Sequence, residues 1–239
     1  MQTIKQKLIE GEGYVILEQI LTESVTSPAL QKHSSTSMVR ASTVDLQYAE
    51  KENCKLLNNI AVYWSDTQID SDCTKIIHAF LIPFIKSVSN TLDLYSSDYV
   101  TIVSNTEYCN PHIDTPHRFK KYNFDNRLLG IQCIVALEDM TIENGVTGLV
   151  PYSQKRDFDI VDCYSGKYTR WFKENAKQFD LSRGSVLMYN CRVLHSSMSN
   201  KSNNNRTALA INYLDNSLVD EVRNIDNIWT SNGRMRPLR

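Results

Sequence analysis

The chain has 239 residues, of which 41% are hydrophobic and 22% are charged, and its formal net charge is -1. A chain of this length can bury a substantial core as one domain. Its 26 basic residues balance 27 acidic ones, so neither nucleic acid nor an anionic membrane is an expected partner. The six cysteines include no C-x-x-C pair, which predicts reduced thiols and a soluble, cytoplasmic protein.

The N-terminus is predicted to form one short helix and one strand. The helix is expected over residues 2–10 and ends before Gly11 and Gly13. The run Tyr14–Leu17 has the β-branched and aromatic content of a strand. We expect this strand at the edge of a sheet.

The next part of the chain is predicted to be mainly helical. Residues 22–43 are rich in Ser and Thr and are expected to be loop with at most a short helix. Apolar residues recur at helical spacing over 46–60 and 74–94, and Pro83 should kink or break the second helix. These helices are expected to pack on a sheet.

From Tyr99 onward, short β-rich segments alternate with polar or glycine-containing turns. The segments are 99–108, 129–137, 146–150, 158–162, 185–189, 192–197 and 207–214. Many short strands without long helices between them predict an antiparallel sandwich or jelly roll. The fold class is therefore mainly β with flanking helices. We expect a single domain over 1–239, with a β core of about 99–214, N-terminal helical support over 1–98 and a C-terminal tail over 215–239.

One short motif carries candidate metal ligands. In an extended segment, side chains alternate between faces, so His112 and Asp114 project from the same side. His195 is the candidate third ligand. Two imidazoles and one carboxylate form the facial triad of non-haem Fe(II) oxygenases. Each residue alone is more often an ordinary surface residue, but together they predict an iron site.

A hairpin is predicted from Cys191 to Leu214, with its turn at Asn200-Lys201. In this register, His195 and Arg206 face one another across the two strands. A guanidinium beside an iron site can bind the distal carboxylate of 2-oxoglutarate through two hydrogen bonds. A β-bulge would shift the register by one residue.

Several further motifs occur in a fixed order along the chain. They are His112-x-Asp114, Leu137-Glu138-Asp139, Glu143-Asn144-Gly145, Pro151-x-Ser153, Gly184, His195-x-Ser197, Asn200-x-Ser202 and Arg206. This set resembles the phytanoyl-CoA dioxygenase-like family of Fe(II)/2-oxoglutarate oxygenases, over roughly residues 99–214. The run from Gly13 to Leu17 resembles the usual N-terminal strand of the family. The chain departs from the family pattern at Gln154 and Ser185, where histidine and aspartate are usual.

The resemblance implies a double-stranded β-helix, which is a cupin-like jelly-roll barrel with helices on its outer sheet. It implies that Fe(II) is bound by His112, Asp114 and His195. Arg206 would then bind the distal carboxylate of 2-oxoglutarate, with support from the Ser197 hydroxyl. Halogenating relatives replace the carboxylate ligand with a small residue, so Asp114 favours oxygen insertion.

Four further residues are expected near the site. Gln132 and Ile134, on one face of a predicted strand, should line the pocket, Gln132 beside the cosubstrate and Ile134 beside the substrate. Arg118 lies in a basic loop, which either binds an anionic substrate or is simply solvated. Trp171 belongs either to a lid or pocket wall or to a surface helix.

The expected activity is hydroxylation of a C–H bond of a small metabolite. Fe(II) is the cofactor, 2-oxoglutarate and O2 are consumed, and succinate and CO2 are released. One alternative is an oxygenase that acts on a protein side chain or a nucleobase. Another is a cupin-like metal-binding module without oxygenase activity, which holds if Arg206 does not face the metal. The sequence contains no heptad pattern that would indicate an oligomeric state.

Overall fold

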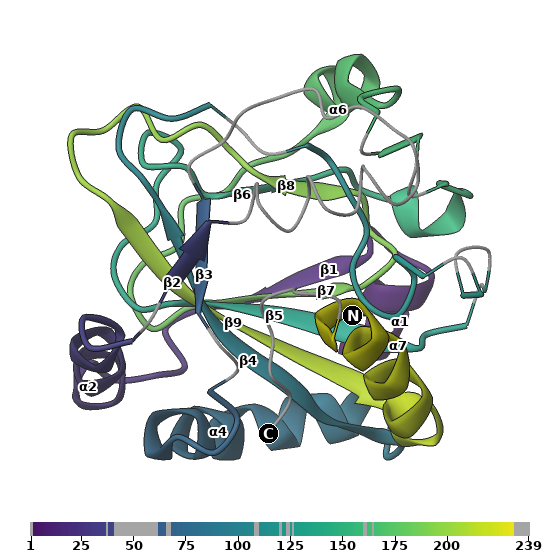
Figure 1. The fold of residues 1–239 in the computed structure, drawn as a ribbon, viewed down its shortest axis with the longest axis horizontal. Helices are drawn as coiled ribbons and strands as arrows, with labels where there is room; N and C mark the ends of the chain where they lie inside the picture. The colour runs from purple at the N-terminus through teal and green to yellow at the C-terminus, as the bar shows by residue number, and fades with distance from the viewer. Residues whose placement is uncertain are drawn as a thin grey trace.

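The larger layer of the fold is a seven-stranded antiparallel sheet with the order β1-β7-β5-β9-β4-β3-β2 (Figure 1). The computed structural model describes residues 2–36, 38–40, 62–65, 68–107, 110–119, 121–122, 125, 127–159, 162–163 and 165–231. The strands of this major sheet are β1 (Tyr14–Leu17), β2 (Met38–Arg40), β3 (Val62–Ser65), β4 (Leu92–Ile102), β5 (Gly130–Ala136), β7 (Val186–Asn190) and β9 (Arg206–Asp215). Strand β1 occupies one edge, as expected for Tyr14–Leu17.

A smaller layer faces the major sheet. Strands β6 (Thr147–Leu149) and β8 (His195–Ser197) pair with each other. Isolated bridges add His112 beside β8 and Lys177 beside β6. Along the chain, successive strands pass between the two layers, which is the topology of a jelly roll. The expected fold class, a double-stranded β-helix with flanking helices, is confirmed.

Side-chain alternation gives the major sheet two buried faces. On β5, Cys133 and Val135 pack towards the helices, whereas Ile134 and Ala136 pack towards the minor sheet. The outer face is covered by α1 (Ile4–Ile9), α2 (Glu23–His33) and α4 (Asp72–Val88). The inner face, between the two sheets, is where the candidate site lies.

Helix α4 is shorter at its C-terminus than its sequence pattern suggested. The Ser71 side chain caps its N-terminus by accepting a hydrogen bond from the Thr74 N–H at 3.2 Å. Pro83 lies within the helix and is exposed. The helix ends at Val88, and Leu92, which continues the apolar spacing, instead begins β4. Strand β4 thus starts seven residues before the predicted start at Tyr99, because buried serines and a bulge hide its alternation.

Three other sequence-based expectations have different outcomes. The loop predicted over 22–43 contains the eleven-residue helix α2. The helix expected over 46–60 lies outside the described residues. The described residues of the strand expected over 158–162 are not in a strand: 158 and 159 are irregular, 162 is helical, and the Asp159 carbonyl accepts a hydrogen bond from the Cys163 N–H at 3.0 Å.

The predicted hairpin between Cys191 and Leu214 is also wrong. His195 pairs with Leu149 in the minor sheet, whereas Arg206 pairs with Ile102 in the major sheet. The polar segment between β8 and β9 carries the chain from one sheet to the other. Buried Asn200 holds this crossing by exchanging backbone hydrogen bonds with Thr106 at 3.0 and 3.1 Å. A Ser/Asn-rich segment is equally compatible with a tight turn and with a crossing between sheets. The local sequence therefore could not distinguish the two.

The remaining elements with defined bounds are two helices and two short 3-10 segments. They are η1 (Ser153–Lys155), α6 (Thr169–Asn175), η2 (Asn216–Leu218) and α7 (Val219–Ser231). Helix α6 packs on a cluster behind the minor sheet, and α7 packs at one end of the two layers. Within the described part of the chain, every helix is too short or too polar to cross a bilayer.

Candidate metal centre

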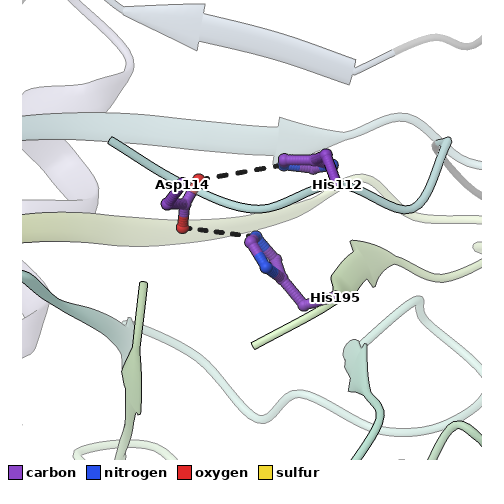
Figure 2. A group of neighbouring side chains, drawn as sticks. All are labelled: His112, Asp114 and His195. Carbon is purple, nitrogen blue, oxygen red and sulfur yellow. Dashed lines mark ion pairs between the residues drawn. The ribbon is translucent and has the colours of Figure 1, made fainter. Parts of the chain in front are cut away.

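The structure brings together the three residues proposed as metal ligands. His112 forms a bridge with β8, Asp114 follows it by two residues, and His195 is the first residue of β8. One ligand atom from each lies within 4.8 Å of the others, and the side chains converge from the two neighbouring segments (Figure 2). Segments that are distant in sequence thus meet at one point.

Backbone carbonyl groups orient both imidazoles. His112 Nδ1 lies 2.8 Å from the Asn110 carbonyl oxygen, and His195 Nδ1 lies 2.9 Å from the Val193 carbonyl oxygen. A carbonyl oxygen can only accept a hydrogen bond, so each neutral ring carries its proton on Nδ1. Each Nε2 therefore presents its lone pair, and the two Nε2 atoms lie 3.9 and 3.3 Å from the Asp114 carboxylate.

The Asp114 carboxylate is held by Tyr189 of β7. The Tyr189 hydroxyl donates to Asp114 Oδ2 at 3.1 Å, and its ring lies 4.7 Å from the His195 ring. Burial raises the pKa of Tyr189 well above its usual range, and the Asp114 charge raises it further. Tyr189 therefore remains a neutral hydrogen-bond donor to the carboxylate.

This donor set fits an iron(II) ion. It combines two unprotonated imidazole nitrogens with one carboxylate, and each donor is oriented by a second group, which is typical of protein metal sites. Of the described residues, these three form the group of His, Cys, Asp and Glu side chains suited to hold a metal.

Arg206 and Ser197 face the same interior as the triad, but further along the strands. Arg206 begins β9 with only 2% of its surface exposed, and its Nη2 donates to the Gly145 carbonyl. Ser197 follows His195 by two residues, and its backbone pairs with Thr147. Both residues lie towards the end of the layers where the chain crosses from β8 to β9.

Gln132 and Ile134 project from β5 into the space between the sheets. Gln132 lies between Tyr189 of β7 and Asn212 of β9 in the strand register. Its Oε1 accepts a hydrogen bond of 2.7 Å from Asn212 Nδ2. Ile134 follows Gln132 by two residues on β5 and packs in the core between the two sheets.

The structure places Arg118 and Trp171 differently with respect to the triad. The Arg118 N–H donates to the Asp114 carbonyl at 3.1 Å, so this residue lies in the turn directly after the ligand. Trp171 packs against Phe158, with ring centroids 5.8 Å apart, in a cluster that includes Ile113. Trp171 therefore packs behind the segments that carry the ligands.

Two cations of the basic loop, residues 117–127, form surface ion pairs. Lys121 pairs with Glu221, and Arg127 pairs with Asp125 at 2.6 Å. Both cations are more than half exposed. For these two residues, the contacts favour a solvated loop over a site for an anionic substrate.

Sequence reasoning missed Tyr189 and Asn212. Both are polar residues within buried strands that are mostly apolar, VLMYN and RTALAINYLD. A polar side chain at an inward position of such a strand was the available signal. It could not be interpreted without knowing which strands lie side by side.

Comparison with known proteins links this arrangement to a family. The family model described as Phytanoyl-CoA dioxygenase matches residues 10–208. No curated protein matches the sequence.

Three solved structures illustrate the similarity in fold. SnoN, a non-haem alpha ketoglutarate dependent epimerase from nogalamycin biosynthesis, is 16% identical with a TM-score of 0.66, over 89% of this chain and 79% of SnoN. HygX from Streptomyces hygroscopicus, with nickel, 2-oxoglutarate and hygromycin B bound, is 13% identical with a TM-score of 0.66, over 90% and 87% of the two chains. The non-haem monooxygenase ThoJ, as a nickel complex, is 16% identical with a TM-score of 0.61, over 89% and 77%.

Proposed function

Since this chain belongs to the phytanoyl-CoA dioxygenase family of iron(II)- and 2-oxoglutarate-dependent enzymes, we propose that it hydroxylates a C–H bond of a small metabolite. The observation that carries the proposal is the convergence of His112, Asp114 and His195, with both Nε2 atoms turned towards the carboxylate. The family membership argues against the alternative of a metal-binding module without enzymatic activity. Succinate and CO2 are the expected co-products.

In this proposal, His112, Asp114 and His195 hold iron(II), which with 2-oxoglutarate and O2 supplies the oxidising power for C–H cleavage. Arg206 binds the distal carboxylate of 2-oxoglutarate, and Ser197 adds a hydroxyl. Burial of the guanidinium supports this role, because a charge-assisted hydrogen bond strengthens where water is excluded.

A small-molecule substrate is supported by the similar structures. SnoN has been solved with Fe3+, alpha ketoglutarate and nogalamycin RO, and HygX with hygromycin B. The surface ion pairs of the basic loop also favour a small molecule over a nucleobase in nucleic acid. We further infer a cytoplasmic location, which the free thiols of Cys73, Cys133, Cys163 and Cys191 support.

A second candidate reaction has specific support. SnoN is described as an epimerase and SnoK as a carbocyclase, with SnoK 18% identical to this chain at a TM-score of 0.60. Epimerisation and ring closure both begin, like hydroxylation, by breaking a C–H bond. Product mass separates the three reactions. Hydroxylation adds one oxygen atom, epimerisation leaves the mass unchanged, and ring closure removes two hydrogen atoms.

An anaerobic titration tests the proposed function. Metal-free protein is titrated with Fe(II) and 2-oxoglutarate while the visible charge-transfer band is followed. We expect a saturable band near one equivalent of iron, its loss in His112→Ala, and at least about tenfold weaker 2-oxoglutarate binding in Arg206→Lys. Folded wild-type protein that binds metal without developing the band would contradict the proposal.

A further inference from the structure

We propose that Gln132 and Asn212 together form a binding site for a hydroxyl or primary carboxamide group of the substrate. We refer to these two side chains as the amide pair. This inference rests on the proposed function, because it assigns the amide pair to the substrate of that same site and not to 2-oxoglutarate.

The amide pair lies in the same cross-strand row as Tyr189, the residue that contacts the candidate metal ligands. In the sheet register, Tyr189 is the cross-strand partner of Gln132, and Gln132 is the partner of Asn212. Tyr189 is the residue whose hydroxyl donates to Asp114. Neighbouring strands are separated by about 4.8 Å, so the amide pair begins one strand away from Tyr189 on the same inner face.

The expected path of 2-oxoglutarate leads away from the amide pair. Arg206 and Asn212 both face inward from β9, and at about 3.3 Å per residue the six residue steps from one to the other span roughly 20 Å. Ser197 also lies towards Arg206, beyond His195. A cosubstrate that reaches from the ligands to Arg206 therefore extends along the strands, and the amide pair remains on the side of the substrate.

The amide pair has unused hydrogen-bonding groups. Asn212 Nδ2 donates to Gln132 Oε1 at 2.7 Å, while the buried Asn212 Oδ1 has no partner. Gln132 Nε2 makes no hydrogen bond to any residue that the structure describes. The two side chains are only 6% and 4% exposed, and an unsatisfied buried polar group costs about 1–3 kcal/mol.

The unused groups define the chemistry of the ligand. The amide pair offers one NH2 group as donor and one oxygen as acceptor, and turning over both amides together leaves the same combination. A hydroxyl or a primary carboxamide can both accept from the donor and donate to the acceptor. A carboxylate has no proton to donate and an ammonium group has no lone pair, so an uncharged polar group fits best.

Acetamide, which carries both a donor and an acceptor, is the probe for this site. Protein labelled with 15N and loaded with Zn(II) and 2-oxoglutarate is titrated with acetamide, and with acetone as an acceptor-only analogue. The Gln132 side-chain amide signals are assigned by their loss in Gln132→Leu. We expect these signals to shift saturably, with acetamide bound about tenfold more tightly than acetone.

Variants separate this site from a general effect of buried amides. Asn212→Leu should remove the preference for acetamide over acetone. The matched control is Gln154→Leu, because Gln154 is also buried but donates to the Gly11 carbonyl at 2.9 Å, and it should leave the preference intact. Gln132 signals that do not respond to acetamide, or that respond equally to acetone, would overturn the proposal.

The 2-oxoglutarate titration distinguishes failure of this inference from failure of the proposed function. We expect Gln132→Leu to change the 2-oxoglutarate dissociation constant by less than about twofold, compared with at least about tenfold for Arg206→Lys. If both variants weaken binding equally, the amide pair belongs to the cosubstrate, and this inference fails while the oxygenase function stands. A wild-type protein without the charge-transfer band would instead contradict the proposed function itself.

Discussion

Each ligand of the candidate centre depends on a partner that does not bind the metal. Backbone carbonyl groups hold the two imidazoles, and the Tyr189 hydroxyl holds the carboxylate. Such partners reduce the freedom of a ligand before the metal arrives and increase its basicity. Substitution of a partner should therefore weaken metal binding through the orientation of a ligand, while all three ligands remain present.

Tyr189→Phe tests this separation. The variant keeps the ring against His195 but removes the hydrogen bond to Asp114, so we expect Fe(II) affinity to fall about tenfold without loss of the fold. Anaerobic Fe(II) titration measures the change. The control is Tyr213→Phe, because the Tyr213 hydroxyl bonds to His78 on the outer face, 2.9 Å from its Nδ1. Equal Fe(II) affinity in wild type and Tyr189→Phe would contradict the prediction.

His117 should make stability depend on pH. It is fully buried, its Nδ1 donates to the Tyr122 carbonyl at 3.0 Å, and burial lowers its pKa to about 4. The unfolded chain binds a proton near pH 6.5, so stability falls as the pH decreases from about 6.5 to about 4, by up to about 3 kcal/mol. Above about pH 6.5 this contribution is fully present.

The measurement for His117 is urea unfolding of metal-free protein at several pH values. His117→Gln should show a smaller decrease in the free energy of unfolding between about pH 7 and about pH 4.5, because the group that titrates is gone. Using metal-free protein removes the separate effect of pH on ligand protonation. A variant with the same pH dependence as wild type would show that His117 does not cause it.

At the scale of elements, helix α7 closes the end of the layers opposite Arg206. Val222 is fully buried in a cluster with Phe119, Tyr122 and Leu214 (the helix is gold in Figure 1). Leu214 follows Asn212 by two residues on β9 and faces the same side. Helix α7 and the loop after the ligand motif therefore lie next to the amide pair.

Val222→Asp should detach this helix locally. A carboxylate in an apolar contact is strongly unfavourable, so we expect faster hydrogen exchange in residues 115–122 and at the end of β9. Exchange in the β5–β7 pair should remain unchanged. The control Glu221→Gln removes the exposed ion pair with Lys121 but leaves Val222 in its apolar cluster. Uniformly faster exchange across both sheets would contradict a local closure.

At the scale of the whole molecule, metal binding should stabilise the fold. The ligands come from the segment after β4 and from β8, so a bound ion joins parts of the chain that meet only in the folded state. At a metal concentration of about 100 times the dissociation constant, the gain is about 2.7 kcal/mol, or roughly 5–10 °C in Tm. Nickel is a suitable probe because it does not oxidise in air.

Thermal unfolding with and without Ni(II) provides the measurement. The increase in Tm should disappear in His112→Ala and in His195→Ala. It should persist in His78→Ala, because His78 lies on α4 and bonds to Tyr213, away from the triad. If the two ligand variants retain the increase, the metal binds elsewhere.

The local sequence determined the chemistry of the candidate centre, the fold class and several elements. Residue type and alternation are local properties, so the motif His112-x-Asp114 predicted two ligands on one side, and Tyr14–Leu17 predicted an edge strand. The order of motifs pointed to the family that the family model also identifies. These inferences needed no knowledge of which strands are neighbours.

Only the tertiary structure decided which residues share a row or a sheet. The crossing at Asn200 separates His195 from Arg206, although a hairpin would have placed them side by side. Tyr189, Gln132 and Asn212 form one row only because β7, β5 and β9 are neighbours in the sheet. Strand pairing depends on contacts between residues distant in sequence, whereas alternation along one strand depends on its own residues. For that reason the candidate ligands could be proposed from the sequence, but the side chains that support and surround them could not.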